Sequence, residues 1–248
     1  MCNEKQLEKQ EVDNMKKIKM FLGISVALNL AFIVMAGFFL AKQGGIGFVK
    51  EQWASLTSNQ EFPDYYVQKK AIFESLDTEA PDKVFLGDSI TDHGEFPEYF
   101  PDENVVNRGI AEDTSKGVLN RIDEIVDRHP KEVYIMIGIN DIGAGSSPTA
   151  YEKNMRRIIE AFDLSETQLV LQSILPINNQ DFNNELSNEK VDDFNQILVS
   201  LSKEYGVGYV DLQPEFQGEN GQLEKDLTID GIHLKGVGYD KWIKSLEY

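Results

Sequence analysis

One serine follows an apolar segment that is expected to form a buried strand. The stretch VFLGDSITDHG, residues 84–94, runs from that segment into Gly87, Asp88 and Ser89. In open α/β sheets, reactive groups collect at the carboxyl ends of the strands, so Ser89 could be a nucleophile. A serine here could equally form a turn or cap a helix. Thr91 replaces the second glycine of the G-x-S-x-G nucleophile elbow, so this stretch alone does not decide between the two.

A serine nucleophile needs a base, and the chain contains three histidines. His129 ends a helical pattern, where stabilising the helix C-terminus is the expected role. His93 lies near Ser89 in the sequence but has no obvious acidic partner. His233 follows Asp230 by three residues, so on a tight turn the two side chains become neighbours. A carboxylate beside an imidazole fixes its tautomer, which makes Asp230 and His233 the candidate acid and base. The alternative is an Asp that caps the terminal helix and a His packed nearby.

Acyl transfer also needs hydrogen-bond donors for a developing oxyanion. Gly109 in VVNRGI and Asn140 in IMIGIND each follow an expected strand. The backbone N–H of Gly109 could approach a ligand closely, and Asn140 could offer its side-chain amide. An ordinary turn at the end of a strand is the alternative for residues 138–141.

The elements that must position these residues alternate along the chain. Apolar runs at 83–86, 105–106, 133–137, 168–175 and 208–212 are expected to be strands, and the helical patterns lie at 114–128, 148–162 and 188–205. A further helical pattern runs from Tyr65 to Leu76. This alternation predicts an α/β fold, a three-layer α/β/α sandwich with a central parallel sheet of about five strands.

An apolar segment without charges, residues 20–41, is long enough to cross a bilayer as a helix. Five lysines precede it and two follow it closely, so the positive-inside rule places the N-terminus in the cytoplasm and the remainder outside. A cleaved signal peptide is the alternative. The expected organisation is a cytoplasmic tail at 1–19, a transmembrane anchor at 20–41, a juxtamembrane linker at 42–64 and one domain at 65–248.

The composition argues against several classes of protein. Residues 43–248 carry 18 basic and 38 acidic residues, a net charge of −20, and nucleic-acid binding needs clustered Lys and Arg. Cys2 is the single cysteine, so neither a disulfide framework nor a cysteine-rich metal cluster is expected. A metal site made of Asp88, Asp92 and His93 would match no familiar ligand spacing. We therefore expect no nucleic acid, no metal and no cofactor.

Four blocks together resemble the SGNH hydrolases, a branch of the GDSL esterases and lipases named for Ser, Gly, Asn and His. The blocks are residues 87–90, Gly109 in NRGI, residues 138–141 and residues 230–233. The resemblance covers about residues 65–248. Within the family, NRGIAEDTSKGVLNRIDEI and GIHLKGVGYDKW look most like the group related to platelet-activating-factor acetylhydrolase and bacterial acylhydrolases.

The resemblance implies that Ser89 is the nucleophile, His233 the general base and later acid, and Asp230 its orienting partner. It also implies an oxyanion hole made of the backbone N–H groups of Ser89 and Gly109 and the side-chain amide of Asn140. Asp88 and Asp141 are expected to hold turns, and Tyr239 and Trp242 to pack the last helix on the core.

The expected function is therefore that of a membrane-anchored, outward-facing serine esterase. The loops at 177–189 and 213–226 are largely polar, which favours acetyl or other short acyl esters of a hydrophilic alcohol such as an envelope glycan. Three alternatives stay open: a lysophospholipase or lipase, an O-acyltransferase and an inactive binding domain.

Overall fold

The computed structural model describes residues 62–76 and 80–246, together with the isolated positions Phe21, Ser25, Asn29 and Met35. Residues 62–248 form one compact unit, and residues 1–61 belong to a second. No helix among the described residues is long and apolar enough to cross a membrane. The predicted anchor at 20–41 lies outside the described residues, apart from those four positions, as do the predicted tail and nearly all of the predicted linker.

Five parallel strands form the central sheet in the order β2-β1-β3-β4-β5. Their bounds are Lys83–Gly87 for β1, Val105–Gly109 for β2, Glu132–Met136 for β3, Gln168–Gln172 for β4 and Gly208–Val210 for β5. Gly87 pairs in register with Gly109 and with Met136, so β1, β2 and β3 end at the same level. The predicted parallel sheet of five strands is confirmed, and residues that follow these three strands emerge at one edge.

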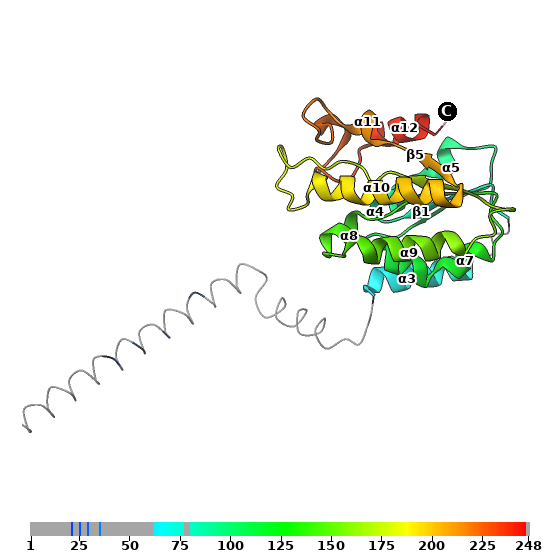
Figure 1. Cartoon of the computed structure of the whole chain (residues 1–248), viewed down its shortest axis with the longest axis horizontal. Coiled ribbons are helices and arrows are strands. Elements are labelled where there is room, and N and C mark those ends of the chain that lie inside the picture. Colours follow the sequence, from blue (N-terminus) through cyan, green and yellow to red (C-terminus); the bar gives the residue numbers. More distant parts are fainter. Residues whose placement is uncertain are drawn as a thin grey trace, which may run out of the picture. The chain divides into compact units, whose positions relative to one another are not determined.

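Helices cover both faces of the sheet, as predicted. Phe85 on β1 stacks on Phe96 of α5 (Phe96–Tyr99) with ring centroids 3.9 Å apart, and its ring meets the edge of Trp242 on α12 (Gly236–Lys244). Tyr209 on β5 points to the opposite face, where it lines a pocket with residues of α10 (Asn188–Tyr205). The neighbouring α9 (Pro148–Glu160) packs along α10 (Figure 1).

Local sequence signals explain the ends of the long helices. Ser147 caps α9 by accepting the N–H of Ala150, and Pro148 occupies the first turn, where no backbone N–H is needed. Ser187 caps α10 in the same way. At its other end α10 stops at Gly206, whose φ of 68° is left-handed and therefore suits glycine.

The predicted helix at 114–128 is interrupted in the structure. It consists of α6 (Ser115–Asn120) and α7 (Ile122–Val126), which are separated by Arg121 in a non-helical conformation. The guanidinium of Arg121 is buried and pairs with Asp113 at 2.8 Å, and it also donates to the carbonyl of Gly87. The break therefore coincides with a buried charged side chain that is tied to the end of β1.

Candidate active site

Ser89 is the first residue of a short helix at the end of β1. This helix, α4 (Ser89–Asp92), follows the strand after Asp88, whose side chain caps it by accepting the N–H of Ile90 at 3.0 Å. A Cβ atom on Gly87 would lie 2.3 Å from the carbonyl oxygen of Met136, so the close approach of the strands requires glycine there. Ser89 is 8% exposed and stands at the carboxyl edge of the sheet.

The structure brings Ser89, His233 and Asp230 together. The Oγ atom of Ser89 lies 2.9 Å from Nε2 of His233, and Nδ1 of His233 lies 2.6 Å from Oδ2 of Asp230. When Nδ1–H donates to the carboxylate, Nε2 carries the lone pair that can accept the serine proton. This arrangement can activate a hydroxyl and stabilise the imidazolium that results.

A tight turn holds the acid and the base. The Thr228 hydroxyl donates to the carbonyl of His233 at 2.7 Å and accepts the N–H of Gly231 at 2.9 Å. Gly231 has a φ of 91°, and a Cβ there would lie 2.6 Å from the backbone carbonyl oxygen of Asn178. Glycine is therefore required both by conformation and by space. The turn brings the side chains of Asp230 and His233 together, as their spacing predicts.

The carboxylate of Asp230 is stabilised in its ionised form. Burial alone would raise its pKa, but hydrogen bonds from the His233 ring and from the backbone of His233 and Ile232 outweigh burial and lower the pKa. The two backbone N–H groups both donate to Oδ1, at 2.8 Å and 3.0 Å. Oδ2 accepts the hydrogen bond from the imidazole, so one carboxylate oxygen binds the backbone and the other binds the His233 ring.

Three carboxyl groups are buried near the nucleophile. Burial raises the pKa of Asp88 to about 7, and the charges of Asp113 and Asp141 add to this effect. Burial also raises the pKa of Asp113 to about 6, although Arg121 opposes the shift, and it raises the pKa of Asp141. Asp141 accepts hydrogen bonds from the backbone N–H and the hydroxyl of Ser115, so it holds the start of α6 against the short helix that follows β3.

Gly109 lies at the expected strand end, but its backbone N–H already has a partner. It donates to Oδ1 of Asn107 at 2.7 Å, so it is not available to a substrate in this structure. A Cβ on Gly109 would lie 2.1 Å from the backbone nitrogen of Asp92. Glycine at position 109 therefore allows β2 to pack closely against α4. The prediction gave a different reason, namely that the backbone N–H would bind the oxyanion.

Three other N–H groups, on Asn140, Glu112 and Ser89, can still donate to a substrate in this structure. Asn140 lies in α8 (Ile139–Gly143), and its Nδ2 donates one hydrogen bond to the carbonyl of Asp113 at 2.9 Å, which leaves its second N–H for another acceptor. Glu112, the residue before Asp113, has a φ of 65°. Within the described residues, the backbone N–H groups of Ser89 and Glu112 have no hydrogen-bond acceptor.

Sequence reasoning missed Glu112. A glutamate gives no signal that its backbone will adopt a left-handed conformation, which is uncommon for residues other than glycine and occurs at functional sites. The signal that could have found it is its position, one residue before the turn that Asn140 binds.

The other two histidines have different surroundings. The ring of His93 is exposed and lies 5.4 Å from the ring of His233, measured between centroids. The side chain of His129 is 76% exposed, and its nearest charged partner is Glu166 at 3.9 Å. In the described part of the chain, no three His, Cys, Asp or Glu side chains are arranged to hold a metal ion.

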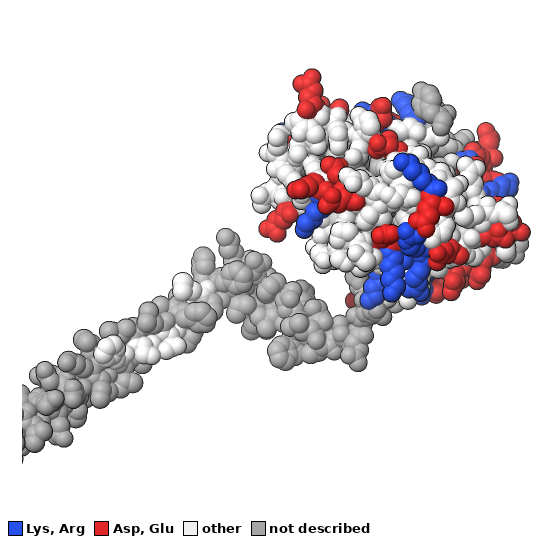
Figure 2. Space-filling view, in the orientation of Figure 1, with Lys and Arg blue, Asp and Glu red and all other residues white. Residues whose placement is uncertain are grey.

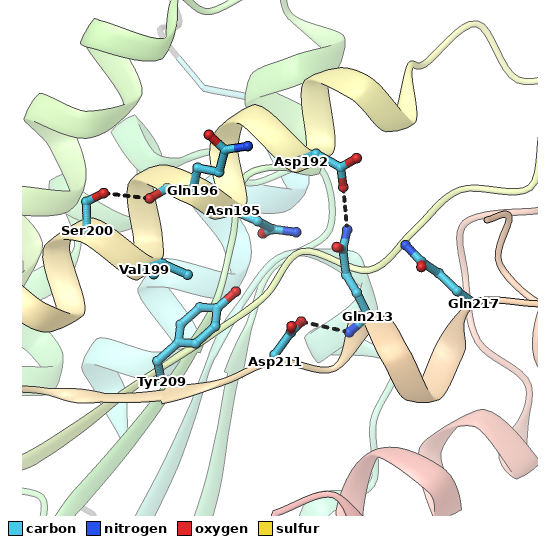
Figure 3. A pocket seen from close by; sticks show the side chains of 9 residues that line it. All are labelled: Asp192, Asn195, Gln196, Val199, Ser200, Tyr209, Asp211, Gln213 and Gln217. Carbon is cyan, nitrogen blue, oxygen red and sulfur yellow. Dashed lines mark hydrogen bonds between the residues drawn. The ribbon is translucent and has the colours of Figure 1, made fainter.

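A polar pocket of about 600 Å³ lies between α10, β5 and α11 (Gln213–Phe216), as Figure 3 shows. The side chain of Gln213 donates to Asp192 across the pocket, and its backbone N–H donates to Asp211. Neither Ser89 nor His233 is among the residues that line it. The pocket is therefore distinct from the candidate active site.

Comparison with known proteins gives consistent matches. The sequence model of the GDSL-like lipase/acylhydrolase family matches residues 85–241. The chain is 28% identical over 175 residues to platelet-activating factor acetylhydrolase IB subunit alpha2 of Rattus norvegicus, which covers 67% of this chain and 74% of the relative. It is 31% identical over 132 residues to thioesterase 1/protease 1/lysophospholipase L1 of Escherichia coli K12, which covers 52% of this chain and 59% of the relative.

Solved structures are similar over most of the compact unit. One from Streptococcus pneumonia, described as a platelet activating factor, has a TM-score of 0.70 and 28% identity, and covers 80% of this chain and 95% of its own. An acetylxylan esterase from Geobacillus stearothermophilus has a TM-score of 0.57 and 21% identity, with coverage of 69% and 94%. The second similarity concerns the fold.

Proposed function

The chain belongs to the GDSL-like lipase and acylhydrolase family, whose members hydrolyse ester bonds, and we propose that it is a serine esterase that works through an acyl-enzyme. The observation that carries this proposal is the continuous relay of Asp230, His233 and Ser89, with 2.6 Å and 2.9 Å between the atoms that exchange or hold protons. The two steps of proton transfer described next follow from that geometry.

In the first half of the reaction, Oγ of Ser89 attacks the ester carbonyl carbon while its proton moves to Nε2 of His233. The tetrahedral intermediate collapses when the bond to the alcohol oxygen breaks, and His233 returns its proton to that oxygen. In the second half, water attacks the acyl-enzyme, its proton moves to His233, and Ser89 leaves with that proton. Asp230 remains ionised throughout and stabilises the imidazolium.

The developing oxyanion needs donors that are in place before the reaction. We assign this role to the backbone N–H of Ser89 and to the free N–H of the Asn140 amide. For the third donor, the backbone N–H of Glu112 replaces that of Gly109, because the latter is bound to Asn107. The left-handed conformation of Glu112 supports this assignment, since it sets the direction of an N–H that has no acceptor in the described residues.

The proposed substrate is an acetyl or other short-chain ester of a hydrophilic alcohol, and an O-acetylated envelope glycan is the leading candidate. The polar loops at 177–189 and 213–226 support this choice, since a long acyl chain needs an apolar trough that gains about 0.8 kcal/mol for each buried methylene. The rat relative is named an acetylhydrolase. Figure 2 shows acidic side chains over the visible face of the domain and a group of basic side chains at its lower edge, and the net charge of −20 over residues 43–248 disfavours an anionic lipid surface.

A lysophospholipase is the second candidate. The Escherichia coli relative carries that name, and Ile229, which directly precedes Asp230, is 67% exposed. An apolar side chain beside the acid of the relay could contact an acyl chain. Esters of graded acyl length separate the two candidates: kcat/KM that rises steadily from acetyl to octanoyl would favour the lipid substrate.

The proposed location is the cell membrane, with a single N-terminal span, the N-terminus in the cytoplasm and the esterase domain outside. The lysines that precede the apolar segment 20–41 support this orientation. Protease added to intact spheroplasts should remove the domain, and protection of the domain would contradict the orientation.

The test of the chemistry uses a fluorophosphonate probe and short-chain esters. Ser89→Ala should lose labelling and nearly all turnover, His233→Ala should lose nearly all turnover, and the double variant should cost little more than either change alone, because the residues act as one unit. Near-normal turnover in Ser89→Ala would refute the mechanism. A wild-type protein that is neither labelled nor active would favour the binding domain, and acyl transfer to an added sugar would favour the transferase.

A further inference from the structure

Two side chains of helix α3 (Asp64–Ser75) bind the carboxylate of Asp92 on α4, the helix that carries Ser89. Asp92, three residues after Ser89, accepts a hydrogen bond from the Tyr65 hydroxyl at 2.6 Å and forms an ion pair with Nζ of Lys69 at 2.7 Å. The Asp92 side chain is 5% exposed, so Tyr65 and Lys69 replace much of the hydrogen bonding that water gives to an exposed carboxylate. The hydrogen bond to Asp92 raises the pKa of Tyr65 to about 12, so its hydroxyl stays a donor at neutral pH.

The same carboxylate also holds the segment that follows β2. Oδ2 of Asp92 accepts the backbone N–H of Ala111 at 3.3 Å. Nearby, Nδ2 of Asn107 donates to the carbonyls of Thr91 and Gly94, at 2.7 Å each, so α4 and the 107–111 segment are joined at two places. Ala111 directly precedes Glu112, the proposed oxyanion donor.

We propose that Asp92, held by Tyr65 and Lys69, is a positioning residue that fixes the backbone N–H of Glu112 relative to Ser89. Helix α3 thereby affects catalysis without touching the substrate. It lies before residue 85, where the family match begins, so the family model does not include it. This inference rests on the proposed function. An oxyanion donor must be correctly placed before the reaction, and a displacement of about 1 Å can cost about 10²-fold in rate.

Removing the Tyr65 hydroxyl or the Lys69 amine leaves the nearly buried carboxylate of Asp92 with fewer hydrogen bonds to offset its lost hydration. The carboxylate would then turn toward water and weaken its hold on Ala111. Because the oxyanion forms in the transition state, the expected defect is in kcat and not in KM. If α3 only stabilised the fold, the same substitutions would lower the stability and leave kcat of the folded enzyme unchanged.

The experiment compares Lys69→Met and Tyr65→Phe with the wild type in the full-length chain. Both substitutions keep most of the side-chain packing and remove one donor to Asp92. Lys70→Met is the matched control, since Lys70 is the next residue on α3 but contacts Asn120 and Glu74. Two quantities are measured: kcat and KM on a short-chain ester, and the rate of amide hydrogen exchange in a peptide that covers residues 109–114.

We expect Lys69→Met and Tyr65→Phe each to lower kcat by about tenfold with KM within about twofold, and Asp92→Asn to lower kcat by up to about 10²-fold. Exchange in residues 109–114 should be faster in all three, while Lys70→Met matches the wild type in both measurements. Kinetics are recorded well below the unfolding temperature of every variant, so a loss of folded protein does not lower kcat.

Wild-type kcat in Lys69→Met and Tyr65→Phe overturns the inference alone, whether or not exchange in residues 109–114 is faster. A loss confined to KM would also overturn it, because it would make α3 part of substrate binding. If the wild type and Ser89→Ala turn over esters equally, the proposed function fails instead. The exchange measurement then still shows whether α3 holds the segment, because it does not depend on catalysis.

Discussion

The carboxyl group of Asp88 gives a prediction about stability whose size follows from the structure. Asp88 is 1% exposed, directly precedes Ser89, and accepts the backbone N–H of Ile90. The substitution Asp88→Asn keeps the volume and an oxygen that can accept this hydrogen bond, but it removes the ionisation. The free energy of unfolding should therefore depend less on pH in the variant than in the wild type.

The sign and size follow from the two pKa values of Asp88. Burial raises its pKa from 3.8 in the unfolded chain to about 7 in the fold. Below pH 3.8 Asp88 is protonated in both the folded and the unfolded state, so its ionisation does not affect the free energy of unfolding. As the pH rises from there through 7, the unfolded state releases its proton more readily than the folded state, so the free energy of unfolding falls. About three pKa units correspond to roughly 4 kcal/mol, most of it lost by pH 8.

The assay is urea unfolding of both proteins from pH 5 to pH 8. Circular dichroism and tryptophan fluorescence follow the transition, since Trp242 is 1% exposed in the fold. Between these pH values the wild type should lose about 2–3 kcal/mol more than Asp88→Asn, with equal dependence on urea concentration. Asp113 and Asp141 remain in both proteins, so the difference reports Asp88 and its repulsion by these two groups. Parallel curves would refute the raised pKa of Asp88.

Two further changes test the site. Asn140→Ala should lower kcat by on the order of 10²–10³ with KM nearly unchanged, because its donor acts in the transition state; an effect on KM alone would make Asn140 a substrate-binding residue. Gly231→Ala should lower kcat by at least about 10²-fold, because the new Cβ would lie 2.6 Å from the backbone carbonyl oxygen of Asn178 and would displace the turn that carries Asp230. Its control is Gly221→Ala, which has a similar φ of 71° but no atom within 4 Å, and which should keep kcat; equal kcat values in the two variants would contradict the role of the turn.

Much of the fold could be predicted from the sequence because burial on both faces of a parallel sheet leaves a clear pattern. Val84, Phe85 and Leu86 are each at most 1% exposed, and the continuous apolar run they form identified β1. The break at Arg121 could not be predicted. The helical pattern continues across that residue, and only the buried ion pair with Asp113 shows why the helix does not.

The candidate site, like the fold, could be predicted from the sequence only in part. The spacing of Asp230 and His233 predicted that their side chains meet, because such a contact depends on local geometry. Gly109 was predicted to donate its N–H to the oxyanion, but in the structure this N–H donates to Asn107. A glycine in a sequence indicates a need for space or for a special conformation, but it does not identify the neighbouring atom that creates the need. At Glu112 the conformation is special although the residue is not glycine, so composition gives no warning.

The distance in sequence between the nucleophile and its base explains why packing must complete the site. Ser89 and His233 are 144 residues apart, and a second hydrogen bond, from the Tyr239 hydroxyl to the carbonyl of Ile90 at 2.7 Å, joins the same two regions. Tyr239 lies on α12, which Trp242 fixes to the sheet by packing on Phe85 and by donating from its Nε1 to Gln172. The predicted packing of this last helix on the core is confirmed. Because α12 follows His233 directly, the hydrophobic contacts of the helix also determine where the imidazole stands relative to Ser89.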